Sequence, residues 1–251
     1  DDRLIAVATC TDADDVLLAT RNGKAIRFQI RYEEDGKGVR VFTGRSSVGV
    51  RGIKLLGDDQ VISMSIVRHE GIAPDLRDAY LKLAGERRRV NGDEDEGTEQ
   101  PEPEEGEASS EAAISEQQFA DLAAREQFVL SVTEKGFGVR SSAYGYRITG
   151  RGGQGINNMD LTRRRDAIVA VFPVGQNDQI MLVTDAGMVI RCPVNDIRIV
   201  RRGGVGVVIF KVGDGERVVS VARLPEESYE NGAADEPDDA PDDQQSTEGD
   251  T

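Results

Sequence analysis

A short pattern, Thr-x-x-Gly-x-x-x-Arg, occurs three times in this chain of 251 residues. Its copies are Thr20, Gly23 and Arg27; Thr133, Gly136 and Arg140; and Thr184, Gly187 and Arg191. The last two copies lie 51 residues apart, and the glycines Gly155 and Gly206 keep the same spacing. In the first copy we place the corresponding glycine at Gly52, because residues 33–38 look like a hairpin extension. Repeats of roughly 40 to 50 residues are typical of propeller-like arrays, in which each small sheet needs neighbours to bury its faces.

Short β-branched segments separated by Gly, Asp and Asn turns surround each copy of the pattern. Such segments are typical of strands joined by tight turns, and a glycine after a strand supplies the positive φ of a hairpin turn. We therefore predict an all-β, propeller-like repeat array of about three blades. The predicted strands are 4–8, 16–20, 24–28, 52–56 and 61–67; 128–133, 138–142, 155–159 and 167–173; and 179–184, 188–192, 206–212 and 217–223. The predicted blades are residues 1–60, 61–166 and 167–225, and the last includes a closing strand.

Residues 69–126 interrupt the second blade and are predicted to be partly helical. A first helix is indicated by apolar residues at helical spacing, Leu76, Ala79, Tyr80 and Leu83. Ser115 and Gln118 match a capping box, which predicts a second helix through Ala124. The two helices would flank an acidic linker, residues 92–111.

The chain carries 46 Asp and Glu against 31 Lys and Arg, a net charge of −15, but the acidic residues are unevenly placed. Residues 92–121 hold 12 of them and residues 226–251 hold 11, and neither segment contains Lys or Arg. The rest of the chain has 31 basic against 23 acidic residues, a net charge of +8. Acidic segments of this composition cannot bury enough apolar surface to fold, so we predict a disordered linker and a disordered tail. The folded body is predicted to be basic.

Several classes of site find no support in the sequence. Cys10, Cys192 and His69 do not have the spacing of a zinc site or a disulfide framework. There is no Gly-x-x-x-x-Gly-Lys loop for nucleotide phosphates. No apolar run approaches the roughly 20 residues needed to span a bilayer. We expect a cytoplasmic chain that binds no cofactor and no membrane, and the missing initiator Met suggests a fragment of a longer protein.

Residues 179–191 (QIMLVTDAGMVIR) and 48–58 (VGVRGIKLLGD) resemble the last blades of the C-terminal domain of the DNA gyrase A subunit, from the bacterial type IIA topoisomerases. The resemblance covers nearly every residue predicted to fold, whereas residues 69–126 are not part of the family pattern. It implies a six-bladed β-pinwheel in which each blade lends a strand to a neighbour and duplex DNA wraps around a basic rim. The chain would then correspond to the last three blades and an acidic tail.

The resemblance also implies a role for the chain. It would bind and wrap duplex DNA without reading its sequence, and so support ATP-dependent negative supercoiling by a nucleoid-associated heterotetramer of the gyrase A and B subunits. The family's catalytic tyrosine lies in a separate cleavage region that no segment here resembles. We therefore expect no enzyme activity from this chain alone, with ATP and Mg acting elsewhere in the holoenzyme.

Two glycine-rich segments, residues 201–206 and 151–155, are degenerate echoes of the family's signature box, Gln-Arg-Arg-Gly-Gly-x-Gly. That box belongs to the family's first blade, which is absent here. Both segments precede a predicted inner strand at equivalent places in the repeat. We interpret them as turns descended from the same repeat.

A protein that wraps DNA in this way needs Lys and Arg along its rim to neutralise phosphates. The sequence offers many candidates, of which the loop arginines 163–165 and 201–202 are the most concentrated. For any single residue the alternative is a solvated strand position without a partner. The candidates are Lys24, Arg27, Lys54, Lys135, Arg140, Arg147, Arg151, Arg163, Arg164, Arg165, Arg191, Arg198, Arg201, Arg202 and Lys211.

Two other interpretations remain open at this point. One is a protein-interaction propeller, whose blades form a binding platform and whose basic residues are incidental. The other is the C-terminal domain of the topoisomerase IV A subunit, which shares the fold. The long acidic tail favours gyrase over topoisomerase IV.

Overall fold

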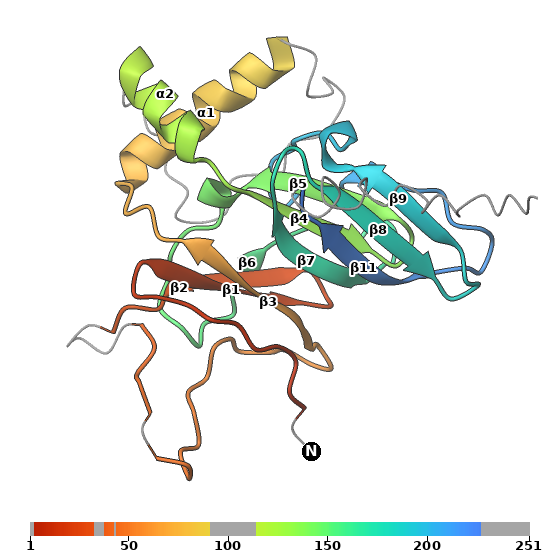
Figure 1. Cartoon of the computed structure of the whole chain (residues 1–251), viewed down its shortest axis with the longest axis horizontal. Helices are drawn as coiled ribbons and strands as arrows, with labels where there is room; N and C mark the ends of the chain where they lie inside the picture. The colour runs from red at the N-terminus through yellow and green to blue at the C-terminus, as the bar shows by residue number, and fades with distance from the viewer. Residues whose placement is uncertain (1–2, 33–37, 43, 91–113, 227–251) are drawn as a thin grey trace, which may run out of the picture.

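The computed structural model describes residues 3–32, 38–42, 44–90 and 114–226, and Figure 1 shows their arrangement. The linker predicted at 92–111 and the tail after Glu226 lie outside the described residues, as does most of the extension predicted at 33–38.

Three antiparallel sheets, which we name A, B and C in chain order, form the body of the protein. Sheet A has the order β3-β1-β2-β6, sheet B the order β10-β5-β4-β7, and sheet C the order β11-β8-β9. The strands of sheet A are β1 (Asp14–Thr20), β2 (Lys24–Gln29), β3 (Val61–Arg68) and β6 (Ile156–Asn157). Those of sheet B are β4 (Phe128–Thr133), β5 (Phe137–Ser142), β7 (Ile168–Val174) and β10 (Val207–Val208). Those of sheet C are β8 (Gln179–Thr184), β9 (Val189–Pro193) and β11 (Val218–Leu224). The all-β repeat architecture is confirmed.

Neighbouring sheets are joined by short strands that cross from one unit to the next. Strand β6 leaves the unit of sheet B and pairs with β2, and β10 leaves the unit of sheet C and pairs with β5. We call these two segments lent strands. Within the described residues, sheet C receives no lent strand.

The sheets do not follow the predicted blade limits at residues 60 and 166. Strand β3 pairs with β1 and strand β7 pairs with β4, so each closes the sheet before it rather than opening the next one. Each strand has two edges that can pair, and the local sequence does not determine which neighbouring strand pairs with each edge. Residues 4–8 and 52–56 form no strand, and the segments predicted at 155–159 and 206–212 shorten to β6 and β10.

The repeated threonine and glycine build the hairpin of each sheet, as predicted. Gly23, Gly136 and Gly187 have φ values of 87°, 77° and 84°. The threonine hydroxyl three residues earlier accepts a hydrogen bond from the amide that follows the glycine, at 3.1, 3.2 and 3.1 Å in the three copies. The pattern therefore encodes a local turn that needs no partner from another unit.

In the structure, the glycine of the first repeat that corresponds to Gly155 and Gly206 is Gly49, not Gly52 as the sequence predicted. The amide of Gly152 donates to the carbonyl of Gly52, and the amide of Gly203 donates to the carbonyl of Asn158 in the same way. Gly52 therefore corresponds to Asn158, and Gly49, three residues earlier, corresponds to Gly155. The φ values agree, because Gly49, Gly155 and Gly206 have 80°, 75° and 80°.

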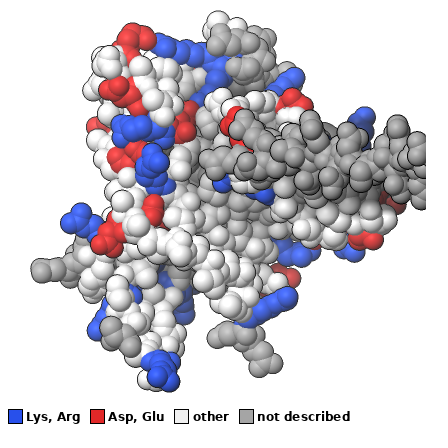
Figure 2. Space-filling view, viewed as in Figure 1, with Lys and Arg blue, Asp and Glu red and all other residues white. Residues whose placement is uncertain are grey.

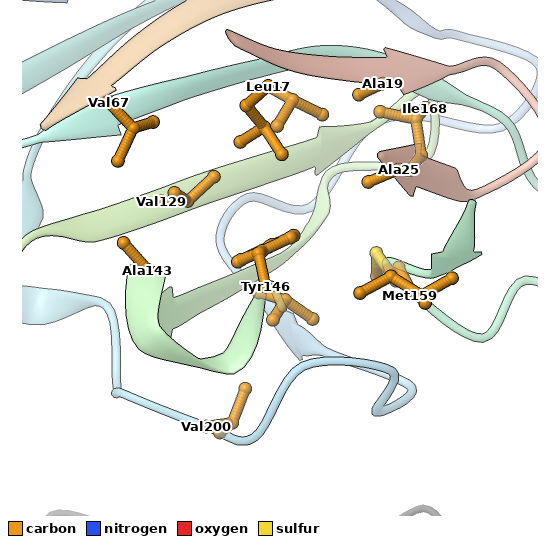
Figure 3. Close-up of a cluster of buried hydrophobic side chains, with 13 residues drawn as sticks. Leu17, Ala19, Ala25, Val67, Val129, Ala143, Tyr146, Met159, Ile168 and Val200 are labelled. Carbon is orange, nitrogen blue, oxygen red and sulfur yellow. The ribbon is translucent and has the colours of Figure 1, made fainter. Parts of the chain in front are cut away.

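The cores lie between the sheets. Leu17 and Val67 of sheet A pack with Val129, Tyr146 and Ile168 in one buried cluster (Figure 3). A second cluster fills the space between sheets B and C around Leu130, Ile180 and Leu182, which are fully buried. Each sheet thus buries apolar surface against the next one, as repeat arrays require.

The predicted helices are confirmed and lie together at one end of the molecule (Figure 1). Helix α1 spans Pro74–Val90 and helix α2 spans Glu116–Arg125, with Ser115 and Gln118 in the capping box. Tyr80 of α1 packs edge-on against Tyr144, which lies in the 3-10 turn η1 (Ala143–Gly145). The helices therefore rest on the end of sheet B. No described helix has the length and apolar character of a membrane span.

Candidate nucleic-acid interface

Two of the repeated arginines are buried and join neighbouring units. The Arg27 side chain is 4% exposed, and its Nε donates to Asp15 Oδ2 at 2.8 Å while its other nitrogens donate to the carbonyls of Arg68 and Ala143. Arg140 is also buried and donates to the carbonyl of Val194 at 2.6 Å, in the turn η2 (Val194–Asp196). Both guanidinium groups are enclosed by protein, so we remove them from the interface that the sequence suggested.

The two glycine-rich segments, residues 201–206 and 151–155, are held by arginines that donate to backbone carbonyls of the protein. Arg202 is buried and donates through Nε to the carbonyl of Gly145 at 2.7 Å and through a second nitrogen to the carbonyl of Asn157. Arg151 is half-buried and donates to the carbonyl of Gly38 at 2.9 Å. These contacts give both segments a structural role as turns between units.

The remaining candidates divide by exposure. The half-buried ones are Lys24, Arg147, Arg151 and Arg164. The exposed ones are Lys54, Lys135, Arg163, Arg165, Arg191, Arg198, Arg201 and Lys211. Figure 2 shows that Lys and Arg side chains are spread over the visible face rather than gathered in one patch.

Residues 160–166, which we call the arginine loop, bring several candidates together at the junction of sheets A and B. The Arg164 guanidinium lies 3.8 Å from the ring centre of Phe137 and donates to the carbonyl of Val205 at 2.5 Å. Burial there lowers the pKa of Arg164. Lys135 donates from Nζ to the carbonyl of Arg164 at 2.5 Å. Arg164 thus anchors the loop, while Arg163 and Arg165 lie exposed on it.

Asp160 fixes the beginning of the arginine loop. Its Oδ1 accepts hydrogen bonds from the amide and the hydroxyl of Thr162, at 2.9 and 2.6 Å. These bonds, with the positive charges of Arg163 and Arg164, hold the pKa of Asp160 below its ordinary value. Arg163 Nε lies 3.9 Å from the second carboxylate oxygen of Asp160, in a loose and exposed ion pair. Such an exposed pair is weak in water.

Arg165 has an unusual backbone. Among the described residues, Arg165 is the only non-glycine residue with a positive φ, which is 47°. The amide of Glu134 donates to the carbonyl of Ala167, and the amide of Asp185 donates to that of Arg217 in the next unit, so Arg165 corresponds to Gly215, with φ 79°. The Arg165 side chain makes no hydrogen bond or ion pair with the described residues. An exposed arginine therefore occupies a place that glycine would fill without strain.

Sequence reasoning missed Arg21, which lies beside this loop. It follows Thr20 in the β1–β2 turn, is exposed, and forms an ion pair with Glu134, the neighbour of Lys135. Its place directly after the repeated threonine was a signal that could have found it. Within the described residues, no cluster of His, Cys, Asp and Glu could hold a metal ion.

The fold and its basic loops define a class, the propeller-type repeat domains whose sheets exchange strands. A family model described as "DNA gyrase C-terminal domain, beta-propeller" matches residues 14–68, 127–175 and 178–225, which are the three units without the helical insertion. The chain belongs to this DNA gyrase C-terminal domain family.

Curated proteins with similar sequences also carry the name DNA gyrase. The chain is 48% identical over 224 residues to the DNA gyrase A subunit of Granulibacter bethesdensis, which covers 88% of this chain and 23% of that protein. It is 41% identical over 233 residues to the DNA gyrase A subunit of Rickettsia bellii, covering 92% and 24%. The chain thus spans about a quarter of the length of these curated relatives. The crystal structure of the C-terminal domain of DNA topoisomerase IV shares the fold, with a TM-score of 0.57 and 18% identity over 89% of this chain and 50% of that chain.

Proposed function

We propose that this chain binds duplex DNA through the phosphate backbone, without reading base sequence, and wraps it as the C-terminal part of the DNA gyrase A subunit. The family membership and the curated relatives support this proposal, as does the excess of basic residues outside the two acidic segments. Exposed Lys and Arg on loops are suited to phosphate contacts, which position a protein on DNA but carry no sequence information.

The observation that carries the proposal is Arg165. Its left-handed backbone is unfavourable for a residue with a side chain, and its guanidinium has no described protein partner. Local strain of this kind is found where a side chain serves a function outside the fold. With exposed Arg163 beside it and Arg164 anchoring the loop, the arginine loop presents two guanidinium groups to a ligand. Guanidinium forms strong hydrogen bonds with phosphate oxygens.

The rest of the activity would need the remaining parts of the holoenzyme. We propose that DNA wrapped by this chain is passed to a cleavage region elsewhere in the gyrase A subunit, and that the gyrase B subunit completes a heterotetramer. ATP and Mg would act there, and this chain would contribute DNA geometry rather than bond chemistry. The proposed location is the bacterial nucleoid in the cytoplasm.

The proposal is tested by measuring duplex affinity across salt for Arg163→Ala/Arg165→Ala. The logarithm of the binding constant falls with the logarithm of salt concentration by about 0.9 per neutralised phosphate, so we expect the slope to decrease by about 1.8 on every duplex sequence. Arg164 is left in place because it anchors the loop. The matched control is Lys82→Ala/Arg89→Ala, which removes the same charge from exposed positions on helix α1.

The control should retain the slope of the starting chain. If both double variants lower the slope equally, the arginine loop has no special role. A loss of affinity confined to one duplex sequence would indicate base readout and contradict the proposal.

A further inference from the structure

The two connections between neighbouring sheets differ in what they contain. Sheets B and C are joined by a short turn, residues 175–178, between strands β7 and β8. Sheets A and B are joined by residues 69–127, between strands β3 and β4, and this connection carries helices α1 and α2. Within the described residues, the junction of sheets B and C has no α-helix. The helical insertion therefore makes one junction different from the other.

The first residues of the insertion are tied to sheet A. His69 directly follows β3, and its Nδ1 lies 2.8 Å from Oδ1 of Asp15 in β1. Asp15 is fully buried, and its other carboxylate oxygen accepts from Arg27. The carboxylate of Glu70 is also buried and pairs at 2.5 Å with Arg125, the last residue of α2. Helix α2 is thereby held to the end of β3.

The carboxylate that binds His69 is specific to the unit that carries the insertion. Equivalent places in the three sheets, five residues before the repeated threonine, hold Asp15, Phe128 and Gln179. In sheet B the repeated arginine, Arg140, lies 5.5 Å from the ring centre of Phe128 instead of pairing with an acid at this place. Burying a carboxylate is unfavourable unless polar and charged partners surround it. Asp15 therefore fixes the position of His69 beside β1.

The two helices are tied to sheet B by different groups. The ring of Tyr144 packs edge-on against Tyr80 of α1, with 5.5 Å between the ring centres, and its hydroxyl donates to the carbonyl of Leu122 in α2 at 3.1 Å. These three residues are buried in one apolar cluster. Arg88 of α1 lies 5.5 Å from the ring centre of Phe128, the first residue of β4. The insertion thus links sheet A to sheet B at the end where the helices lie (Figure 1).

The helices and the arginine loop lie at opposite ends of β4. The strand begins at Phe128, beside the helices, and ends at Thr133, in the turn that contacts the arginine loop. A strand of this length spans about 20 Å. At the far end, Arg21 of sheet A pairs with Glu134 of sheet B. Rotation of one sheet against the other would move Arg21 away from the arginine loop, so a contact that fixes the angle between the sheets also fixes the spacing of these cations.

We propose that the helical insertion is a clamp that holds sheets A and B at the angle at which Arg21 and the arginine loop contact one duplex. The residues that position the clamp on sheet A are Asp15, His69, Glu70 and Arg125. The inference rests on the proposed DNA binding, although the angle between the sheets can be measured without DNA. The path of the duplex is then fixed where it crosses from sheet A to sheet B, and is less constrained from sheet B to sheet C.

The test releases the clamp from sheet A without changing the charge balance of acidic and basic residues. The variant His69→Ala/Glu70→Gln/Arg125→Gln removes one acidic and one basic group, and it leaves Asp15 paired with Arg27. The matched control is Arg87→Gln/Glu116→Gln, which removes an ion pair between the two helices. Circular dichroism should give the same helix and strand content for all three chains. If the triple variant loses helix, His69→Ala alone replaces it, with the same expected direction.

Spin labels report the angle between the sheets in the absence of DNA. The labelled places are equivalent and exposed, one residue before each hairpin glycine, in a chain whose Cys10 and Cys192 are replaced by serine: Asn22, Lys135 and Ala186. We expect the distribution of 22–135 distances to be broader in the triple variant than in the starting chain and the control. The 135–186 distribution should be the same in all three. An unchanged 22–135 distribution, or equal broadening of both distributions, would overturn the proposal.

A measurement with DNA tests the consequence for the duplex. The triple variant removes none of the proposed phosphate contacts, so its duplex affinity and salt slope should equal those of the control. Its shift in the linking number of closed circular duplex should be smaller, because the angle is no longer fixed. A shift equal to that of the control would overturn the proposal. A starting chain that binds duplex without any shift would contradict the proposed wrapping instead, and the label distances would still decide whether the insertion is a clamp.

Discussion

Replacing Arg165 by glycine should separate the stability of the arginine loop from its affinity for DNA. The backbone φ of 47° lies in the left-handed region, which costs a residue with a side chain roughly 1–2 kcal/mol. Glycine removes that cost but loses roughly 0.5–1 kcal/mol through the greater freedom of the unfolded chain. We therefore expect the free energy of unfolding to rise by about 0.5–1 kcal/mol. For a folded body of this size, each kcal/mol raises Tm by about 2–4 °C.

The assay compares Arg165→Gly with Arg165→Ala, because both remove the same charge and only glycine relieves the backbone. Calorimetry should give a higher Tm for the glycine variant than for the alanine variant. Both should lower the salt slope of duplex binding by about 0.9, the contribution of one phosphate contact. Equal Tm values for the two variants would refute the strain argument, and an unchanged salt slope in both would refute the phosphate contact.

Three further predictions concern the core, the tail and the helices. Arg27→Ala leaves Asp15 buried without its arginine, and should lower the free energy of unfolding in urea by about 3–5 kcal/mol. Arg191→Ala, at the exposed counterpart, should change it by less than about 0.5 kcal/mol. Similar losses in the two variants would contradict the buried role of Arg27. Truncation after Glu226 removes ten acidic residues, and we expect these residues to compete with phosphates for the basic body. The truncated chain should therefore bind duplex more tightly, most visibly at about 50 mM salt, where screening is weak. Equal affinities would exclude this competition. Burial, with the negative charge of Glu70, raises the pKa of Tyr144 to about 12, so its contribution to stability is complete below the ordinary value of 10.0 and is lost as pH rises from there toward 12. Tyr144→Phe should therefore lose less stability than the starting chain as pH rises from 10.0 toward 12. Identical losses would show that Tyr144 does not govern this range.

The features that the sequence predicted are those encoded over a few residues. The turn of each hairpin follows from a threonine hydroxyl and a glycine of positive φ three residues apart. The second helix follows from the capping box of Ser115 and Gln118. Both interactions are completed within one turn of chain, so their residue spacing is sufficient to reveal them.

The features that the sequence did not predict depend on contacts between units. The places of β3 and β7 depend on which strand edge each one meets, and Gly49 could be distinguished from Gly52 only by the ladder between units. Charge alone did not distinguish Arg27, which is enclosed beside Asp15, from Arg165, which is exposed. The loop arginines could be listed from the sequence, but the strain at Arg165 required backbone geometry.

The proposed function depends on DNA wrapping, and DNA topology measures wrapping directly. Closing nicked circular duplex with a ligase in the presence of this chain fixes any wrap as a change in linking number. We predict a shift in the distribution of topoisomers that grows with the amount of chain, and a smaller shift for Arg163→Ala/Arg165→Ala than for Lys82→Ala/Arg89→Ala. A distribution that stays at that of protein-free DNA, under conditions where the duplex is bound, would contradict it.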